Sequence, residues 1–279
     1  MESWHEFKKK IEKSQVGHKA DLYGKLLIWK ISAPITYLLV RTPVTANQIT
    51  VFQEILGVIG AFLLIFKNVK INILGILLLQ VGFIFDCVDG EVARYKNQSS
   101  VRGVYLDLIG HQFVIPMFLF FIGVGVYQRL GHLDAIIASF FAGIFVLRTE
   151  LYSMLGVINT MIERQENANY SYKVLKENFP DGIKNYKGAL NVRSGWKWII
   201  KKKWSYPDSM NILTLAVILE YFIGSFKLYG VTLSPTYLLV YFFSIPIVFG
   251  RIYAYIKYFR NYSVEKHFLF MYNRFKNIK

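Results

Sequence analysis

The sequence predicts an all-α protein, a polytopic membrane bundle of six transmembrane helices preceded by an N-terminal interfacial amphipathic helix. Two observations carry this prediction. The 279 residues are 54% hydrophobic and 17% aromatic, while only 18% are charged, a balance typical of membrane proteins. In addition, apolar runs of about 20 residues, the length that crosses the hydrocarbon core of a bilayer, recur along the whole chain.

Residues 1–46 are expected to form a cytosolic segment that lies on the membrane surface. Apolar residues recur there at helical spacing beside a run of lysines, at Trp4, Phe7 and Ile11. Thr45 or Asn47 can cap the helix that follows. The segment lacks the short apolar block and small-residue cleavage site of a signal peptide, so we expect none.

Six spans follow within a catalytic domain over residues 47–256, placed by apolar length and by the charges that bracket each run. We expect them at 47–66, 71–95, 101–128, 133–160, 208–228 and 233–256. A polar, basic cytosolic loop at 161–206 joins the fourth span to the fifth. A basic and aromatic cytosolic tail occupies 257–279.

The chain has a net charge of +15, and the distribution of its basic residues indicates how it is oriented in the membrane. Of the 33 Lys and Arg residues, 28 fall on one side of the predicted spans and one, Arg148, falls inside a span. The other side holds only four, Lys67, Lys70, Arg129 and Lys227. The positive-inside rule therefore places both termini in the cytoplasm, and we expect a multi-pass protein of a prokaryotic cell membrane. A basic chain can also bind nucleic acid, but this distribution favours topology and anionic lipid, so we expect no nucleic-acid partner.

The second span ends in ionisable residues although it is otherwise apolar. Asp86, Asp89, Gly90 and Ala93 stand at i, i+3, i+4 and i+7, so two carboxylates and two small residues share one helix face. Burying such carboxylates without a partner is costly in a membrane. A polar group must therefore approach this face closely.

The third span repeats the arrangement with Gly103, Asp107 and His111, each four residues apart and stacked on one face. Counted from the intervening turn at about 1.5 Å per helical residue, Asp89 and Asp107 lie at one depth, and Asp86 and His111 lie together somewhat deeper. Three carboxylates and an imidazole that converge between two helices require a cation. Oxygen ligands of this kind suit Mg²⁺ or Mn²⁺.

Two other interpretations of these residues stay open. The carboxylates can line a water-filled channel or pair with Arg94 and Arg102, or they can form the ion site of a cation transporter. The single cysteine, Cys87, excludes an internal disulfide and a zinc site built on several thiolates.

The string from Asp86 to His111 resembles the signature of the CDP-alcohol phosphotransferase family. It reads Asp-x-x-Asp-Gly-x-x-Ala-Arg, eight residues, then Gly-x-x-x-Asp-x-x-x-His. The spacing agrees throughout, and most of the chain agrees in its order of elements. The one departure is the last position, where the family has a fourth aspartate and this chain has His111.

The resemblance implies a metal-dependent membrane transferase of lipid metabolism that moves a phosphoalcohol group from a CDP-linked donor to a hydroxyl acceptor and releases CMP. It implies that Asp86, Asp89 and Asp107, with His111, hold Mg²⁺ or Mn²⁺. Gly90, Ala93, Arg94 and Gly103 would bind the nucleotide. Arg94 can equally be a positive charge at the end of a span.

His111 stands where the family places the carboxylate thought to accept the acceptor's proton. Imidazole has an unperturbed pKa of about 6.5, close to cytosolic pH, so we expect His111 to be the catalytic base. A neutral nitrogen ligand brings no charge to a metal, and a histidine in a span can also simply join helices by hydrogen bonding.

Arg148, inside the fourth span, is a candidate contact for the acceptor's phosphate, or it forms a salt bridge with Glu150 or Glu220. The expected partners are a CDP-linked donor, a lipid or alcohol acceptor, membrane lipids and a second copy of the chain in a homodimer. A non-catalytic scaffold that lost activity with the fourth aspartate is a further alternative.

Overall fold

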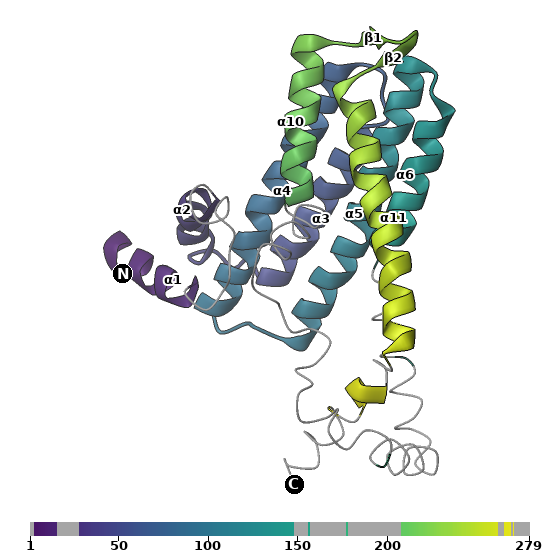
Figure 1. Cartoon of the computed structure of the whole chain (residues 1–279). Coiled ribbons are helices and arrows are strands. Elements are labelled where there is room, and N and C mark those ends of the chain that lie inside the picture. Colours follow the sequence, from purple (N-terminus) through teal and green to yellow (C-terminus); the bar gives the residue numbers. More distant parts are fainter. Residues whose placement is uncertain are drawn as a thin grey trace. The chain divides into compact units, whose positions relative to one another are not determined.

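The computed structural model describes residues 3–15, 28–147, 208–261 and 265–268, together with the single residues 156, 177 and 270. Within these residues the chain is helical apart from one short hairpin, which confirms the predicted class (Figure 1). The helices are α1 (Trp4–Gln15), α2 (Trp29–Leu39), α3 (Ala46–Leu63), α4 (Val69–Tyr95), α5 (Val101–Leu130), α6 (Leu133–Val146), α10 (Asp208–Ile223) and α11 (Pro235–Arg260). The hairpin pairs β1 (Phe226–Leu228) with β2 (Val231–Leu233).

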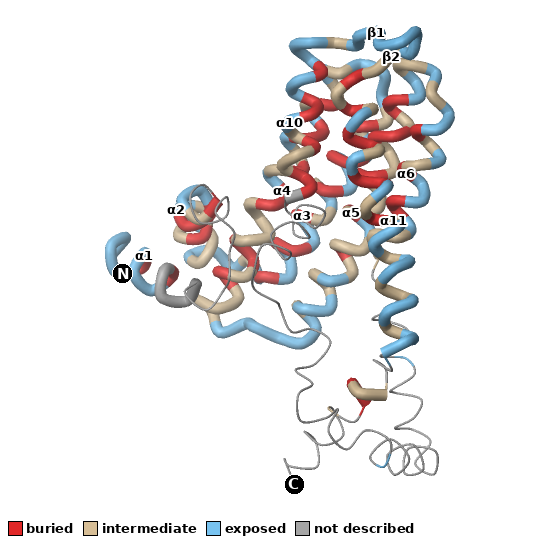
Figure 2. The backbone as a smooth tube through the Cα atoms, viewed as in Figure 1, coloured by how far each residue is buried: buried red, intermediate tan, exposed pale blue. Residues whose placement is uncertain are grey.

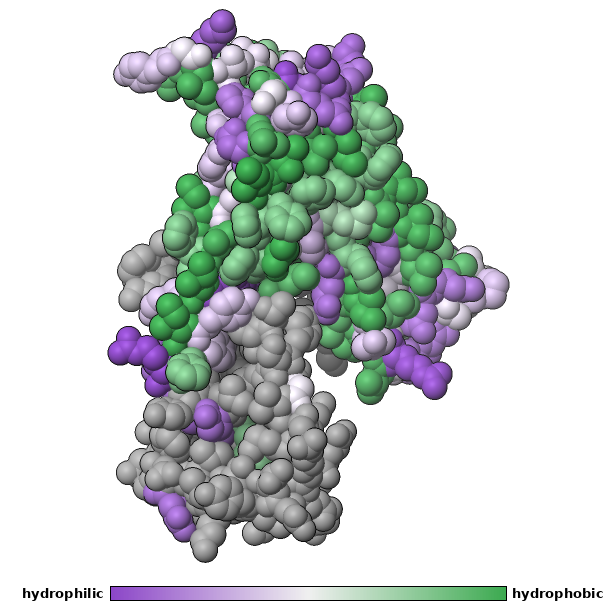
Figure 3. Space-filling model, turned by 90° about the vertical axis from the view of Figure 1, so that its right-hand side faces the viewer, coloured by the Kyte–Doolittle hydropathy of each residue, from purple (hydrophilic) through white to green (hydrophobic). Residues whose placement is uncertain are grey.

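Four of the described helices, α3, α4, α5 and α11, are long and apolar enough to cross a membrane. The shorter apolar helices α6 and α10 have 14 and 16 residues. Hydrophobic side chains cover much of the helix flank seen in Figure 3, as a lipid-facing surface requires. The chain is therefore a multi-pass membrane protein, and the count of six spans stays a prediction, since the fourth expected span runs beyond residue 147.

Local signals define the ends of the membrane helices. Thr45 caps α3 through a capping box, in which its hydroxyl accepts from the Gln48 backbone N–H and the Gln48 side chain accepts from the Thr45 N–H. Of the two expected caps, Thr45 is thus the one used. Ser100 caps α5 by accepting from the Gly103 N–H, and Gly131 ends α5 in the left-handed conformation.

The prediction of a helix over 208–228 was wrong at its C-terminal end. Helix α10 stops at Ile223 because Gly224 has a φ of 70° and its N–H bonds back to the Glu220 carbonyl. Residues Tyr229 and Gly230 both have positive φ, which suits the two-residue turn between β1 and β2. Composition marked this segment as apolar but did not distinguish a hairpin from a last helical turn.

Helices α3, α4 and α5 pack together within the first of two compact units, which comprises residues 1–143 and 205–244. Helices α3 and α4 cross where Gly60 faces Gly75. A Cβ atom built on either glycine would lie 2.7 Å from the other's carbonyl oxygen, so only glycine permits this approach. Figure 2 shows buried segments alternating with exposed ones along these helices.

The N-terminal helices attach to α4. In α1, Phe7 and Ile11 are buried while the lysines between them are exposed. Its placement on a membrane surface stays a prediction. Helix α2 is joined to α4 by the fully buried Glu91, whose carboxylate accepts from the Ser32 and Thr36 hydroxyls at 2.8 and 2.5 Å.

A buried ion pair joins α5 to α10. The Arg129 Nε lies 2.7 Å from Glu220 Oε1, and both side chains are less than a tenth exposed. Asn72 of α4 and Thr236 of α11 also accept from the Arg129 guanidinium, at 2.7 and 3.0 Å. Glu220, one expected partner of Arg148, is thus paired with Arg129, and a salt bridge between Glu220 and Arg148 stays a prediction. Arg148 lies outside the described residues.

The second unit comprises residues 144–204 and 245–279. In its described part, Arg251 of α11 donates to the carbonyls of Phe145 and Val146 at 3.0 and 3.4 Å, at the C-terminal end of α6. A guanidinium there satisfies carbonyls that lack helical partners. The expected loop 161–206 and most of the tail 257–279 lie outside the described residues.

Candidate active site

The motif residues of α4 and α5 meet between the two helices. His111 Nε2 lies 3.3 Å from Asp86 Oδ1 and 3.6 Å from Asp107 Oδ1. The contact between Asp86 and His111 is the one expected from their equal depth. All three side chains are between a fifth and two fifths exposed, so the cluster is open to one side.

Helix α3 forms a third wall of the site, which was not predicted. Thr50 donates a hydrogen bond of 2.5 Å to Asp89 Oδ2, and this joins α3 to the more deeply buried carboxylate of the motif. One turn further, Gln53 Nε2 donates to Asp86 Oδ1 at 3.2 Å and to Glu54 Oε1 at 3.4 Å. The α3 side chains therefore satisfy one oxygen of each motif aspartate on α4.

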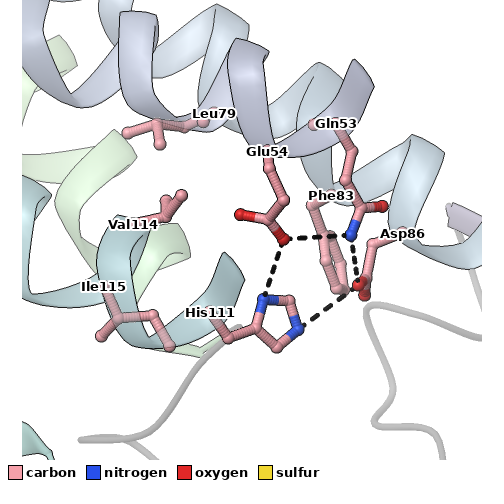
Figure 4. A pocket seen from close by; sticks show the side chains of 10 residues that line it. Gln53, Glu54, Leu79, Phe83, Asp86, His111, Val114 and Ile115 are labelled. Atoms are coloured by element: carbon pink, nitrogen blue, oxygen red, sulfur yellow. Dashed lines mark hydrogen bonds and ion pairs between the residues drawn. The ribbon is translucent and has the colours of Figure 1, made fainter. Parts of the chain in front are cut away.

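Glu54 is the functional candidate that the sequence analysis missed. Its Oε1 lies 3.8 Å from His111 Nδ1, an ion-pair separation, so Glu54, Gln53, Asp86 and His111 form a closed ring of contacts (Figure 4). The signal was available, since a carboxylate within an apolar span is a functional candidate by default. It stands alone on its helix, and only the packing of α3 shows which residues it meets.

The cluster has the properties of a cation site. It gathers four carboxylates, those of Glu54, Asp86, Asp89 and Asp107, and in the described part of the chain neither Lys nor Arg forms an ion pair with any of them. The expected alternative of pairing with Arg94 and Arg102 was therefore wrong. Asp107 Oδ1 is buried with no hydrogen-bond partner. An orphaned carboxylate oxygen beside other acidic groups fits a divalent cation.

A cavity opens next to the cluster and extends along the helices. One end is polar and the other apolar, and the lining residues are Gln53, Glu54, Gly57, Leu79, Gly82, Phe83, Asp86, His111, Val114 and Ile115 (Figure 4). The polar cluster is thus continuous with an apolar stretch of the helix packing.

The expected nucleotide-binding residues have different neighbours in the structure. Gly90 lies beneath the Arg94 guanidinium, because a Cβ there would be 3.1 Å from Arg94 Nη1. Gly103 lies beside the α3 helix start, where a Cβ would be 3.1 Å from Asn47 Oδ1. Ala93 packs against the apolar cluster at the start of α3. Gly90 thus gives room to Arg94, whose buried Nε has no hydrogen-bond partner.

Comparison with known proteins agrees with the motif. Residues 43–178 match the family model described as CDP-alcohol phosphatidyltransferase. The match contains α3, α4 and α5 and therefore the whole cluster.

Two curated proteins share part of this region. A protein named bifunctional IPC transferase and DIPP synthase from Thermococcus kodakarensis is 39% identical over 90 residues, which is 32% of this chain and 20% of that protein. A protein of the same name from Aquifex aeolicus is 30% identical over 109 residues, 39% of this chain and 24% of that protein. The alignments thus span about a fifth to a quarter of these relatives' lengths.

Solved structures share the fold. The Mycobacterium tuberculosis phosphatidylinositol phosphate synthase with CDP-DAG bound superposes with a TM-score of 0.51 at 15% identity, covering 80% of this chain and 90% of that chain. The same synthase in complex with manganese and citrate gives 0.50 at 14% identity, covering 79% and 85%. At these identities the likeness establishes the fold.

Proposed function

Because residues 43–178 match the family model described as CDP-alcohol phosphatidyltransferase, we propose that this chain is a membrane-embedded transferase that uses a CDP-linked donor. It moves a phosphoalcohol group from the donor to a hydroxyl acceptor and releases CMP. The observation that carries the proposal is the cluster of carboxylates and one imidazole between α3, α4 and α5, which has no basic counter-charge among the described residues.

The structurally similar synthase has been solved in complex with manganese. We propose Mg²⁺ or Mn²⁺ here, held by Asp86, Asp89, Asp107 and His111. The mixed oxygen and nitrogen set favours Mn²⁺ more than an all-carboxylate set would, since imidazole is a better ligand for Mn²⁺ than for Mg²⁺. When bound, the metal supplies positive charge that neutralises the donor's pyrophosphate.

The reaction forms one bond and breaks one at the phosphorus that carries the alcohol. The acceptor oxygen attacks that phosphorus, the bond to the CMP oxygen breaks, and the acceptor's proton must leave. His111, with its ring nitrogens between carboxylates, is the proposed base. Gly90, Ala93, Arg94 and Gly103 are the proposed nucleotide contacts, and Arg148 the proposed contact for an acceptor phosphate.

Two donor and acceptor arrangements fit the motif. A lipid donor, such as the CDP-DAG named with the structurally similar synthase, can transfer to a soluble alcohol, or a soluble CDP-alcohol can transfer to a lipid. The homodimer expected from the sequence stays a prediction.

CMP release by the purified protein tests the activity. The protein is incubated with Mn²⁺ or Mg²⁺, a panel of CDP-linked donors and a panel of lipid and soluble acceptors. Release that requires one donor, one acceptor and metal identifies the arrangement. A protein that no cytidine nucleotide stabilises against heat, with either metal, contradicts the proposal, because a ligand that binds only the folded state raises its stability.

The proposed site faces the cytoplasm, as do both termini, because the positive charge gathers on that side. Single cysteines at Gln98, Asn68 and Gly131 in a Cys87→Ser background test this with an impermeant thiol reagent on sealed vesicles of both orientations. Gln98, in the turn between α4 and α5, should react only from the cytoplasmic face, and the other two only from the opposite face. The reverse pattern refutes the orientation.

A further inference from the structure

Glu54 has a place in the cluster that the motif does not account for. It lies in α3, outside the string from Asp86 to His111, and its side chain is only 17% exposed within an apolar helix. A carboxylate at such a position is costly unless it has a partner. Its only charged neighbour within ion-pair distance among the described residues is His111, at 3.8 Å.

We propose that Glu54 is a ligand of the divalent cation and supplies the acidic oxygen that the motif lacks at His111. The inference rests on the proposed function, since it assumes that the cluster binds metal. It places one ligand on α3, so that the cation joins three helices.

The ligand atoms are close enough for one ion. One atom each from Glu54, Asp107 and His111 lie within 4.8 Å of one another. Two atoms bound to one Mn²⁺ at about 2.2 Å are separated by at most about 4.4 Å. Three such atoms at equal separations lie about 3.8 Å apart, so side-chain shifts of about half an ångström bring all three onto one cation.

Two neighbours hold the Glu54 carboxylate at the cluster. Gln53 donates to both Glu54 Oε1 and Asp86 Oδ1, so one amide sets the separation of these carboxylates. On the facing helix, a Cβ on Gly110 would overlap the Glu54 carboxyl group, so the glycine provides the space that the carboxylate occupies. The position of the Glu54 carboxylate is thus set by Gln53 on its own helix and by Gly110 on the facing helix.

Charge supports the same assignment. His111 as a neutral ligand leaves three motif carboxylates, and Glu54 raises the number to four. A simple hydrogen-bond partner for His111 would need an acceptor oxygen but no charge. The amide of glutamine also offers an acceptor oxygen. Glu54→Gln therefore separates a metal ligand from a hydrogen-bond partner.

Mn²⁺ binding to the purified full-length chain, without nucleotide, tests the proposal. Free Mn²⁺ is measured by its electron paramagnetic resonance signal during titration of wild type, Asp107→Asn, Glu54→Gln and Glu91→Gln. Glu91→Gln is the matched control, because it removes a buried carboxylate charge that faces α2. We expect at least a tenfold weaker Kd for Glu54→Gln and for Asp107→Asn, and a change below threefold for the control.

A rescue variant adds a second criterion. His111→Asp in the Glu54→Gln background returns a carboxylate to the site and should recover most of the lost Mn²⁺ affinity. Gly110→Ala displaces the Glu54 carboxylate and should weaken Mn²⁺ binding at least tenfold in wild type, but should add less than threefold in a Glu54→Ala background. The comparison of Gly110→Ala in wild type and in the Glu54→Ala background still tests the proposal if Glu54→Gln fails to fold.

The outcomes separate the two proposals. Wild type that binds no Mn²⁺ refutes the metal site of the proposed function. The assignment of Glu54 alone is refuted by either of two results, provided that wild type binds Mn²⁺ and Asp107→Asn does not. In the first, Glu54→Gln leaves the Kd for Mn²⁺ unchanged. In the second, Gly110→Ala weakens Mn²⁺ binding as much in the Glu54→Ala background as in wild type.

Discussion

The close crossing of α3 and α4 leads to a prediction that links helix packing to metal binding. A Cβ on Gly60 would lie 2.7 Å from the Gly75 carbonyl oxygen, whereas ordinary contact begins near 3.4 Å. The obstructing atom is backbone, so Gly60→Ala must part the helices by about 0.7 Å. Overpacking of this kind costs about 1–3 kcal/mol, partly offset by about 1 kcal/mol of improved helix propensity.

We therefore expect Gly60→Ala to lower the Tm in detergent by up to about 6 °C, since a net cost of up to about 2 kcal/mol corresponds to a few degrees in a chain of this size. Metal ligands tolerate displacements of only about 0.2 Å, so parting α3 from α4 should also weaken Mn²⁺ binding by about tenfold. Thr50 and Glu54 would move away from the aspartates of α4.

Gly250→Ala is the control, because nothing lies within 4 Å of a Cβ at that exposed position of α11. It should keep the wild-type Kd for Mn²⁺ and keep or slightly raise the Tm. Thermal unfolding and Mn²⁺ titration measure both quantities in the same preparations. If Gly60→Ala behaves like Gly250→Ala, the crossing does not set the geometry of the site and the reasoning is refuted.

Three other predictions concern charged groups. Asp89→Asn and Asp107→Asn should each reduce CMP release at least a hundredfold while the protein stays folded, since the amide keeps the shape and removes the charge; near-normal turnover in both would exclude them as ligands. His111→Asp should retain transfer and move the acid limb of the pH–rate profile to lower pH, whereas His111→Gln should lose transfer; an unchanged limb removes His111 as base. Glu220→Ala should destabilise the protein by about 3–5 kcal/mol in thermal unfolding, because it leaves the Arg129 charge buried without a partner. Adding Arg129→Met should recover most of that loss, so equal Tm values in the single and double variants would contradict the prediction.

The sequence predicted those parts of the site that local periodicity determines. Asp86 and Asp89 share a face because of helical spacing, and a short turn between α4 and α5 returns Asp107 and His111 to the same level. No tertiary information was needed to bring Asp86 to His111. The helix starts also followed from local signals, as the cap at Thr45 shows.

The parts that the sequence did not predict depend on contacts between distant segments. Hydropathy placed α3 in the bundle but not its rotation, and the rotation decides whether Thr50 and Glu54 face the aspartates or lipid. The crossing of Gly60 with Gly75 sets that rotation and the register of the two helices. Glycines are frequent in membrane helices, so the composition of α3 alone did not identify this pair.

His111, which replaces an aspartate of the family motif, and Glu54, which the motif does not include, belong to one site formed by α3, α4 and α5. An imidazole on α5 leaves the cluster with one carboxylate fewer, and Glu54 places a carboxylate on the facing helix, next to Gly110 of α5, which has no side chain. The fourth carboxylate of the cluster therefore lies on α3 and not on α5, and it is close enough to Asp107 and His111 to share one cation with them. Because the imidazole lies between Glu54 and Asp86, His111 can then exchange a proton at a site whose negative charge is complete without it.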